Sequence, residues 1–197
     1  MSFRIRIATP DDAEALLGLY APYVRDTTIS FETEVPTVEE FRGRIEEHLE
    51  NTCHLVLEDA DAGRAAGFAY NSTFRARPAY RWASETSIYI SEAYQGRGLG
   101  AILLEALEDL MRAQGVRMSE ACITSSNTAS IAFHRSCGYR LCGEQASCGY
   151  KLGTWLSITW MEKQLLPLDT DPEAPHAPSP QAIEAALAAA NERLAGH

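Results

Sequence analysis

The sequence predicts one α/β or α+β domain over residues 1–166, followed by a tail outside that domain. The first observation is that strand-like and helix-like apolar patterns alternate along these residues and include a hairpin pattern. The second is size, because 197 residues, 46% of them hydrophobic, suffice for one core that needs no disulfide or metal. The third is the segment 167–180, whose five prolines predict a disordered or extended linker before residues 181–197.

The N-terminal part is predicted to begin with a strand and two helices. Apolar and basic residues alternate over 3–7, which is typical of a half-buried strand. Thr9 and Pro10 suit the N-cap and first position of a helix, and residues 27–36 follow as a loop or short strand. Thr37 begins a capping-box pattern at the start of a second helix. The apolar face of this second helix contains Val38, Phe41, Ile45 and Leu49.

The later elements follow from apolar spacing and turn residues. Residues 54–57 and 65–70 flank a turn-rich segment and predict a hairpin. Residues 82–90 favour extended backbone, and a helix with i, i+3, i+4, i+7 spacing begins at Leu99 and ends before Gly115. The remaining predictions are a strand at 121–124, a helix at 128–137 ended by Gly138, strands at 139–143 and 156–161, and a weakly amphipathic helix at 181–195.

The balance of charges argues against nucleic acid as the main partner. Seventeen Lys and Arg against 27 Asp and Glu give a formal net charge of −10, which repels a phosphate backbone. A local exception is the loop that contains Arg75, Arg77 and Arg81. Guanidinium groups suit carboxylate, phosphinate or sulfone oxygens, although a solvated surface loop would carry the same residues.

Cysteine usage and hydropathy predict a reduced, cytoplasmic protein. The five cysteines include no C-x2-C pair, so neither a disulfide framework nor a zinc site is expected. The N-terminus lacks the apolar core of a signal peptide, and no apolar run approaches the roughly 20 residues that span a bilayer. We therefore expect neither a bound metal nor a membrane partner.

The segment Gln95–Gly100, QGRGLG, lies between the strand predicted at 82–90 and the helix that begins at Leu99. Glycines let the backbone approach a ligand closely, and the N–H groups at a helix N-terminus attract an anion. The turn therefore predicts a phosphate cradle, although a plain strand–helix junction can have the same glycines. Its spacing excludes a Rossmann turn, G-x-G-x-x-G, and a P-loop, which requires Lys followed by Ser or Thr.

The sequence around this turn resembles the GCN5-related N-acetyltransferase (GNAT) family, in which Gln-x-x-Gly-x-Gly after a strand is the pyrophosphate loop. Four segments closely resemble its phosphinothricin acetyltransferase branch: FRARPAYRWASETSIYI, QGRGLG, NTASIAFHRSCGY and GYKLGTWLSITWM. The resemblance covers residues 4 to about 165 and does not include the tail. It implies an α/β (α+β) GNAT fold with a mixed, mostly antiparallel sheet, splayed strands and about four flanking helices.

The resemblance implies acetyl-CoA as co-substrate, in the cleft where two neighbouring strands splay apart. Its pantetheine arm would pair with strand backbone, its pyrophosphate would meet the N–H groups of the glycine turn, and an Asn would bond it near the thioester. The positions that match these roles are Ile88, Tyr89, Ile90, Gln95, Gly96, Arg97, Gly98, Leu99, Gly100, Ala101, Asn127 and Ser130. Asn127 also suits an ordinary helix N-cap, and the two roles are compatible.

Two positions match catalytic roles in the family. Acetyl transfer requires a neutral amine, so a base must take a proton from the ammonium, and Glu85 matches the family's catalytic glutamate. From the residues alone, the simpler interpretation of Glu85 is a strand acid that faces solvent or pairs with Arg81. His134 lies where many relatives have a Tyr that protonates the leaving thiolate. It is expected to act as an acid, to bond the cofactor, or simply to pack.

The resemblance also implies the acceptor and the assembly. The expected activity is acetylation of a small amino-acid-like amine, such as phosphinothricin, methionine sulfone or methionine sulfoximine, by direct transfer in a ternary complex. The expected assembly is a homodimer. Two alternatives stay open, a non-catalytic acyl-CoA-binding module and an N-acetyltransferase for a protein or polyamine. The positions that match the substrate side are Phe31, Glu32, Arg75, Arg77, Pro78, Ala79 and Tyr80.

Overall fold

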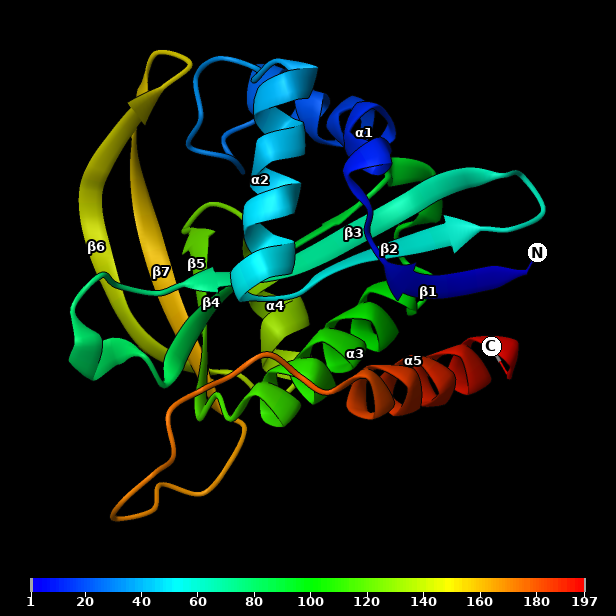
Figure 1. Ribbon diagram of the computed structural model, residues 1–197. Helices are drawn as coiled ribbons and strands as arrows, with labels where there is room; N and C mark the ends of the chain where they lie inside the picture. Colours follow the sequence, from blue (N-terminus) through cyan, green and yellow to red (C-terminus); the bar gives the residue numbers. More distant parts are fainter. Residues whose placement is uncertain (1, 197) are drawn as a thin grey trace.

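A seven-stranded sheet forms the centre of the computed structural model, which describes residues 2–196 (Figure 1). The order across the sheet is β1-β2-β3-β4-β5-β7-β6. The strands are β1 (Phe3–Ile7), β2 (His54–Asp59), β3 (Arg64–Thr73), β4 (Ala83–Ile90), β5 (Met118–Thr124), β6 (Arg140–Lys151) and β7 (Thr154–Gln164). β4 and β5 are parallel and the other neighbours are antiparallel, which confirms the predicted mixed sheet.

The parallel pair β4–β5 opens partway along its length. Its register covers three residue pairs, from Ala83–Met118 to Glu85–Glu120. β4 continues to Ile90 and β5 to Thr124 beyond this register, so the two strands separate after Glu85. The splayed strands of the predicted fold are therefore present. We call this opening the splay.

Helices cover both faces of the sheet (Figure 1). α1 and α2 pack on one face, against buried side chains of β2 and β3, and α3 and α5 pack on the opposite face. No helix within residues 2–196 is both long and apolar enough to cross a bilayer. The helices are α1 (Ala13–Asp26), α2 (Val38–Asn51), α3 (Leu99–Gln114), α4 (Thr128–Ser136) and α5 (Pro180–Ala195), with short 3-10 turns at Pro10–Asp12, Pro78–Tyr80 and Glu92–Tyr94.

The start of α2 forms as its sequence predicts. The Thr37 hydroxyl accepts from the Glu40 N–H at 3.2 Å, and the Glu40 carboxylate accepts from the Thr37 N–H at 2.7 Å, which is a capping box. Phe41 and Ile45 are buried on the predicted apolar face. Val38 is an exception, because this first-turn residue is 39% exposed and lies outside the buried face.

The hairpin of β6 and β7 is longer than the sequence predicts. We expected strands at 139–143 and 156–161, whereas β6 spans Arg140–Lys151 and β7 spans Thr154–Gln164. β6 is an edge strand that is exposed along most of its length. Its side chains therefore show no apolar alternation from which the full strand could be predicted.

The proline-rich segment is extended and attached to the domain. Residues 167–179 contain no helix or strand, as the prolines predict. The Trp82 indole N–H donates to the Glu173 carbonyl at 2.8 Å, and Arg117 pairs with Asp169 at 2.9 Å. Of the two forms predicted for this segment, disordered or extended, the structure has the extended one.

The tail helix α5 lies along α3 and the outer edge of β1 (Figure 1). Ala186, Ala190 and Leu194 are its buried side chains. The Asn191 amide oxygen accepts from the Ile5 N–H at 2.7 Å, and its amide nitrogen donates to the Ile5 carbonyl at 3.0 Å. Asn191 thus supplies hydrogen bonds that a further strand would otherwise make with this edge.

Candidate active site

The glycine turn between β4 and α3 has the geometry of an anion cradle. Gly96 and Gly98 have φ angles of 70° and 74°, in the left-handed region that favours glycine. Gly98 is the N-cap of α3, so the N–H groups of Leu99 and Gly100 have no partner within the helix, whereas that of Ala101 donates to the Gly98 carbonyl at 3.1 Å. The helix dipole adds partial positive charge at the same place.

A cavity of about 470 Å³ connects this turn with β4 and α4. All twelve predicted cofactor positions line it, from Ile88 in β4 through the glycine turn to Asn127 and Ser130. A smaller cavity of about 60 Å³ lies at the splay between β4 and β5 and is lined by Ile88, Asn127, Ser130 and His134 among others. Because the two cavities share lining residues, they form one continuous region of the fold.

Tyr23 of α1 lines the larger cavity and was not predicted from the sequence. Its hydroxyl donates to the Ile90 carbonyl at 2.6 Å, and the Gln95 amide donates to the same carbonyl at 2.9 Å. The end of β4 is therefore tied both to α1 and to the glycine turn. The Ile90 carbonyl thus already accepts two hydrogen bonds from the protein itself. No local motif in the sequence marks Tyr23 as a residue of the site.

The start of α4 positions three of the predicted side chains. Asn127 is the N-cap, and its Oδ1 accepts from the Ser130 N–H at 3.1 Å. His134 is buried one turn later, with its Nδ1 at 2.9 Å from the Ser130 carbonyl. A carbonyl only accepts, so Nδ1 carries the ring proton. Burial lowers the pKa of His134 below its ordinary value, and the imidazole is therefore neutral near pH 7.

Glu85 occupies the last paired position of β4 before the splay. Burial raises the pKa of its carboxyl, and the nearby charge of Arg75 partly opposes this effect. Arg81 donates to the Pro78 carbonyl at 3.1 Å and lies over the ring of Trp82. No ion pair between Glu85 and Arg81 occurs in the part of the chain that the structure describes.

Two more glutamates continue the row that begins at Glu85. Glu85 is in register with Glu120 of β5, and Glu120 is in register with Glu162 of β7. Residues in register on neighbouring strands point to the same face of a sheet. Glu162 forms an ion pair with Arg140, its partner on β6. The sequence analysis missed Glu120, because all of α3 separates β4 from β5 in the chain and only the fold reveals their register.

The loop after β3 places part of the predicted substrate side beside this row. The Arg75 guanidinium lies 4.8 Å from the ring centre of Phe74 and 5.7 Å from that of Tyr80. Phe74 in turn contacts the ring of Trp160 on β7 at 5.5 Å. Pro78 and Tyr80, with Ala79 between them, form a 3-10 turn at the outer end of this loop.

The other predicted substrate positions lie in the segment between α1 and α2. The Phe31 ring packs directly against Gly149 of β6, where a Cβ would have no room. Glu32 forms an ion pair with Arg44 of α2 at 2.6 Å. Phe31 thus links the α1–α2 segment to the long hairpin, whereas the Glu32 carboxylate is held by α2.

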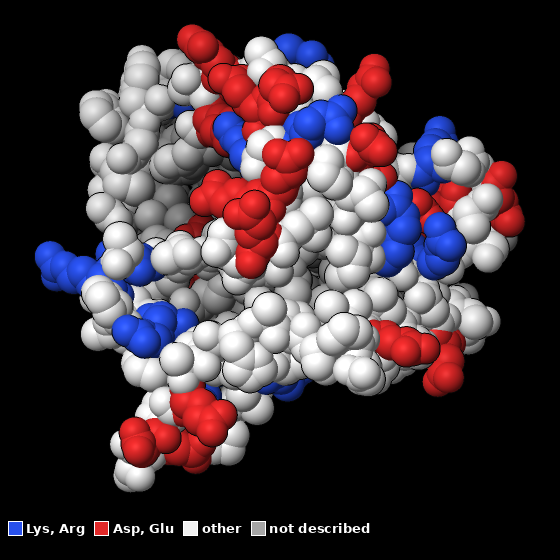
Figure 2. Space-filling model, in the orientation of Figure 1, with Lys and Arg blue, Asp and Glu red and all other residues white. Residues whose placement is uncertain are grey.

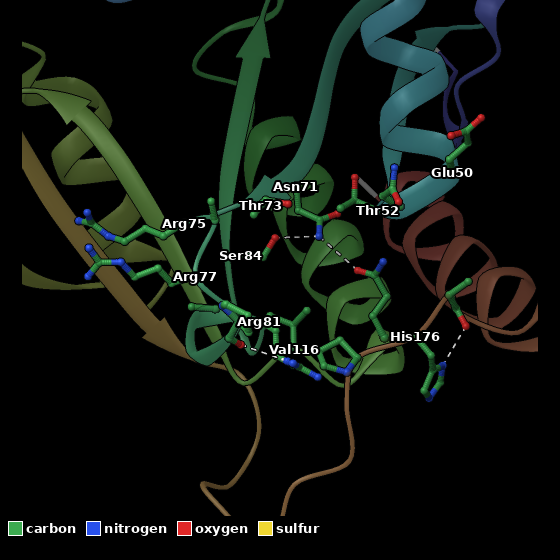
Figure 3. A pocket seen from close by; sticks show the side chains of 17 residues that line it. Glu50, Thr52, Asn71, Thr73, Arg75, Arg77, Arg81, Ser84, Val116 and His176 are labelled. Atoms are coloured by element: carbon green, nitrogen blue, oxygen red, sulfur yellow. Dashed lines mark hydrogen bonds between the residues drawn. The ribbon is translucent and has the colours of Figure 1, made fainter.

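A separate cavity of about 410 Å³ lies on the other side of β4 (Figure 3). It contains the buried Asn71, whose amide donates to the Ser84 hydroxyl at 3.0 Å. Ser84 precedes Glu85 in the strand, so their side chains point to opposite faces of the sheet. Arg75, Arg77 and Pro78 of the predicted substrate side also line this cavity, although Figure 3 shows the guanidinium groups of Arg75 and Arg77 pointing away from it.

The charges around the site are of both signs. Figure 2 shows acidic side chains gathered over α2 and basic ones at the loop that follows β3. The basic cluster predicted for Arg75, Arg77 and Arg81 is therefore present in the loop, whereas the neighbouring row of glutamates is acidic. Within residues 2–196, no three His, Cys, Asp or Glu side chains are grouped so that they could hold a metal ion.

Comparison with known proteins relates this chain to acetyltransferases. Residues 5–160 match the family described as "Acetyltransferase (GNAT) domain". The chain is 34% identical over 164 residues to a phosphinothricin N-acetyltransferase of Streptomyces coelicolor, covering 82% of this chain and 96% of that protein. It is 35% identical over 173 residues to an L-methionine sulfoximine/L-methionine sulfone acetyltransferase of Pseudomonas paraeruginosa, covering 87% of this chain and 100% of that protein.

A solved structure leads to the same family. A GNAT superfamily phosphinothricin acetyltransferase from Sinorhizobium meliloti, in complex with AcCoA, is similar with a TM-score of 0.82 and 31% identity. The similarity covers 91% of this chain and 97% of that one. The family match ends at residue 160, before α5 begins. The chain belongs to the GNAT family, in its phosphinothricin acetyltransferase-like branch, and is an N-acetyltransferase.

Proposed function

We propose that this enzyme transfers the acetyl group of acetyl-CoA to the amine of a small amino-acid-like substrate, directly and in a ternary complex. The observation that carries the proposal is the position of Glu85. Glu85 is half-buried at the last β4–β5 pair, and the residues that follow it in β4, from Thr86 to Ile90, line the cavities at the splay and the glycine turn. A base is thus placed at the end of the strand segment that lines a site suited to a nucleotide-linked thioester.

The residues around the larger cavity fit acetyl-CoA. The N–H groups between Gly96 and Ala101 suit a pyrophosphate, and Arg97 contributes a positive charge. The edge of β4 that faces β5 beyond Glu85 has backbone groups outside the β4–β5 register, which suits an extended amide-containing arm. Asn127 and Ser130 line both cavities and would hold the part nearest the splay. When bound, acetyl-CoA supplies the activated acetyl group as a thioester.

Glu85 prepares the acceptor for attack by taking one proton from its ammonium. An ammonium has no lone pair, so this transfer must come before the new N–C bond forms. Burial raises the pKa of Glu85, which makes its carboxylate a stronger base than an exposed glutamate. The positive charge of Arg75 acts in the opposite direction, because it favours the ionised form of Glu85.

His134 contributes as a contact to the co-substrate rather than as a proton donor. Its Nδ1 proton is committed to the Ser130 carbonyl, and its lowered pKa leaves Nε2 without a proton at neutral pH. A neutral imidazole in this tautomer accepts a hydrogen bond through Nε2. We therefore choose the cofactor-contact role among the alternatives for this residue.

The acceptor carries both a cationic amine and an anionic or strongly polar group. The row of glutamates suits an ammonium, and Arg75 suits carboxylate, phosphinate or sulfone oxygens. Relatives named for phosphinothricin and for methionine sulfoximine or sulfone support this class. Phe31, Arg77 and the 3-10 turn Pro78–Tyr80 would border the acceptor, and Glu32 would act through its pair with Arg44.

We further propose how the chain is organised and where it works. Residues 1–166 form the catalytic unit, 167–180 a linker and 181–197 an added tail. Two such chains form a homodimer, which the exposed edge strand β6 supports. A cytoplasmic location is supported by the five cysteines, all of which are free thiols in the structure.

The experiment is thiol release from acetyl-CoA with a panel of acceptors. The panel contains phosphinothricin, methionine sulfone, methionine sulfoximine and, for the polyamine alternative, spermidine. We expect turnover with at least one amino-acid analogue and a loss of roughly 10²- to 10⁴-fold in kcat for Glu85→Gln, because general-base catalysis is removed. The KM for acetyl-CoA should stay near that of the wild type.

The matched control is Glu144→Gln, the same chemical change on exposed β6, where Glu144 is in register with Thr159. Turnover of spermidine alone would replace the proposed acceptor class with a polyamine. Equal kcat values for the wild type and Glu85→Gln would remove Glu85 as the base.

A further inference from the structure

Glu120 is more buried than Glu85 and Glu162, the other two glutamates of the row. The residue is 7% exposed, and none of the described residues makes a hydrogen bond or ion pair with its carboxylate. Glu162, the next member of the row, is paired with Arg140. Neither carboxylate oxygen of Glu120 is sealed from solvent, so the group keeps some contact with water at the splay.

Another buried glutamate, Glu108, has cationic partners. Glu108 of α3 is 1% exposed, on the other face of the sheet. Lys163 pairs with it at 2.6 Å and Arg112 at 3.3 Å. Glu108 therefore has the ion pairs typical of a structural acid through its Oε2, while its Oε1 is buried without a partner. Glu120 has no such ion pair, and its carboxylate oxygens keep contact with solvent, so the group is available at the splay.

The surroundings of Glu120 leave its carboxyl partly protonated at neutral pH. Burial is the main cause, and the charges of Glu162 and Glu85 add to it, so that its pKa rises to about 7. The guanidinium groups of Arg75 and Arg140 act in the opposite direction. The thiols that face this group are Cys122 on β5 and Cys142 on β6, and burial raises the pKa of each.

We propose that Glu120 is a second carboxylate of the acceptor site, which works with Glu85 as a pair to hold the acceptor ammonium and to share the proton that it releases. The two residues are in register across the last pair of β4 and β5, on one face and beside the splay. The proposal rests on the proposed function, because it assigns Glu120 a role toward that acceptor. It also restricts the acceptor to amines that enter as ammonium ions.

The proton balance of the pair is as follows. The ammonium enters between Glu85 and Glu120 and displaces the proton that the pair holds into solvent. One ammonium proton then moves to the pair, the amine nitrogen forms its bond with the acetyl carbon, and the carbon–sulfur bond breaks. The second nitrogen proton ends on the sulfur of CoA. The pair keeps the proton that it received from the ammonium, which restores its starting state when the amide leaves, so the only proton released to water is the one displaced when the ammonium entered.

Glu120→Gln is the decisive variant, because it keeps the shape of the side chain and removes its charge. With methionine sulfone or phosphinothricin as acceptor, we expect the KM for the acceptor to rise about tenfold and the KM for acetyl-CoA to stay unchanged. The acidic limb of the kcat/KM profile should move to lower pH, because the variant removes the carboxyl whose pKa is about 7 and leaves Glu85 alone to ionise. Glu144→Gln is the matched control and should follow the wild type.

Carbon-13 NMR of glutamate-labelled enzyme tests the pair without any acceptor. The carboxyl signal that disappears in Glu120→Gln should titrate near pH 7 in the wild type and at lower pH in Glu85→Gln. If Glu120→Gln keeps the wild-type acceptor KM and pH profile, or if Glu85→Gln leaves that titration unmoved, the pair is refuted while the proposed function stands. A wild type that is inactive with every acceptor refutes the proposed function first.

Discussion

Glu85 and Glu120 stand side by side and neither forms an ion pair within residues 2–196, although the charge of Arg75 acts on both. Each has a raised pKa because burial disfavours its charge, and the charge of Glu85 raises the pKa of Glu120 further. Such an arrangement lowers stability and is retained where the chemistry needs a proton acceptor. The splay is therefore a place where stability and activity are in conflict.

Stability should depend on pH through Glu120. Its carboxyl ionises near pH 4.5 in the unfolded chain and near pH 7 in the folded one, so the folded state loses relative stability as the pH rises between these values. We expect Glu120→Gln to be more stable than the wild type by about 1–2 kcal/mol at pH 8, allowing for partial solvent screening. At pH 4.5 the two proteins should melt alike.

Melting temperatures of both proteins at the two pH values measure this effect. Glu144→Gln shows what the loss of one exposed negative charge does by itself. The same difference between Glu120→Gln and the wild type at both pH values would contradict the assigned pKa.

The sequence predicted some residues of the site and missed others for a definite reason. Gly96, Gly98 and Asn127 belong to local motifs whose geometry depends on a few neighbouring residues, and the structure has that geometry. Tyr23 and Glu120 depend on contacts between elements that are far apart in the chain. Their chemistry follows from packing and register, which no local pattern records.

Among the secondary-structure elements, those with one buried face were predicted best. α3 spans Leu99–Gln114, and Gly115 ends it in the left-handed conformation as expected. The strand predicted at 139–143 contains only the first four residues of β6, because an exposed strand has no periodic apolar signal. The extent of α5 followed from its own sequence, whereas its place against β1 did not.

The contact between α5 and β1 gives a test of the tail. Asn191→Ala removes both hydrogen bonds to Ile5 and should lower the free energy of unfolding by about 1–2 kcal/mol. Glu192→Ala, at an exposed position of the same helix, should change it by less than about 0.5 kcal/mol. Urea denaturation followed by circular dichroism measures both. Equal effects of the two substitutions would mean that the tail does not hold the edge of β1.

At the scale of the whole molecule, three large apolar side chains are exposed together at the end of the β6–β7 hairpin. Tyr150, Leu152 and Trp155 are each at least 59% exposed. Apolar groups gathered at one end of a projecting hairpin are typical of a surface that meets another protein. This feature supports the proposed homodimer.

The dimer predicts a native mass twice that of the chain, measurable by light scattering after size exclusion. Trp155→Ser removes the most exposed of the three aromatic or aliphatic side chains and should shift the protein towards the monomer at micromolar concentration. The fold should be retained, because the side chain is 66% exposed in one chain. A wild type that is monomeric at all concentrations tested would contradict the homodimer.

The hydrogen bonds of Asn191 to Ile5 have a consequence for how many copies can join through their sheets. A sheet with two open edges can add strands at both ends and grow without limit, as fibrils do. Here α5 obstructs the β1 end, and β6 forms the other end. Pairing of β6 with β6 of a second copy uses up both open ends at once. In the proposed homodimer, the tail would therefore limit association through the sheets to two copies.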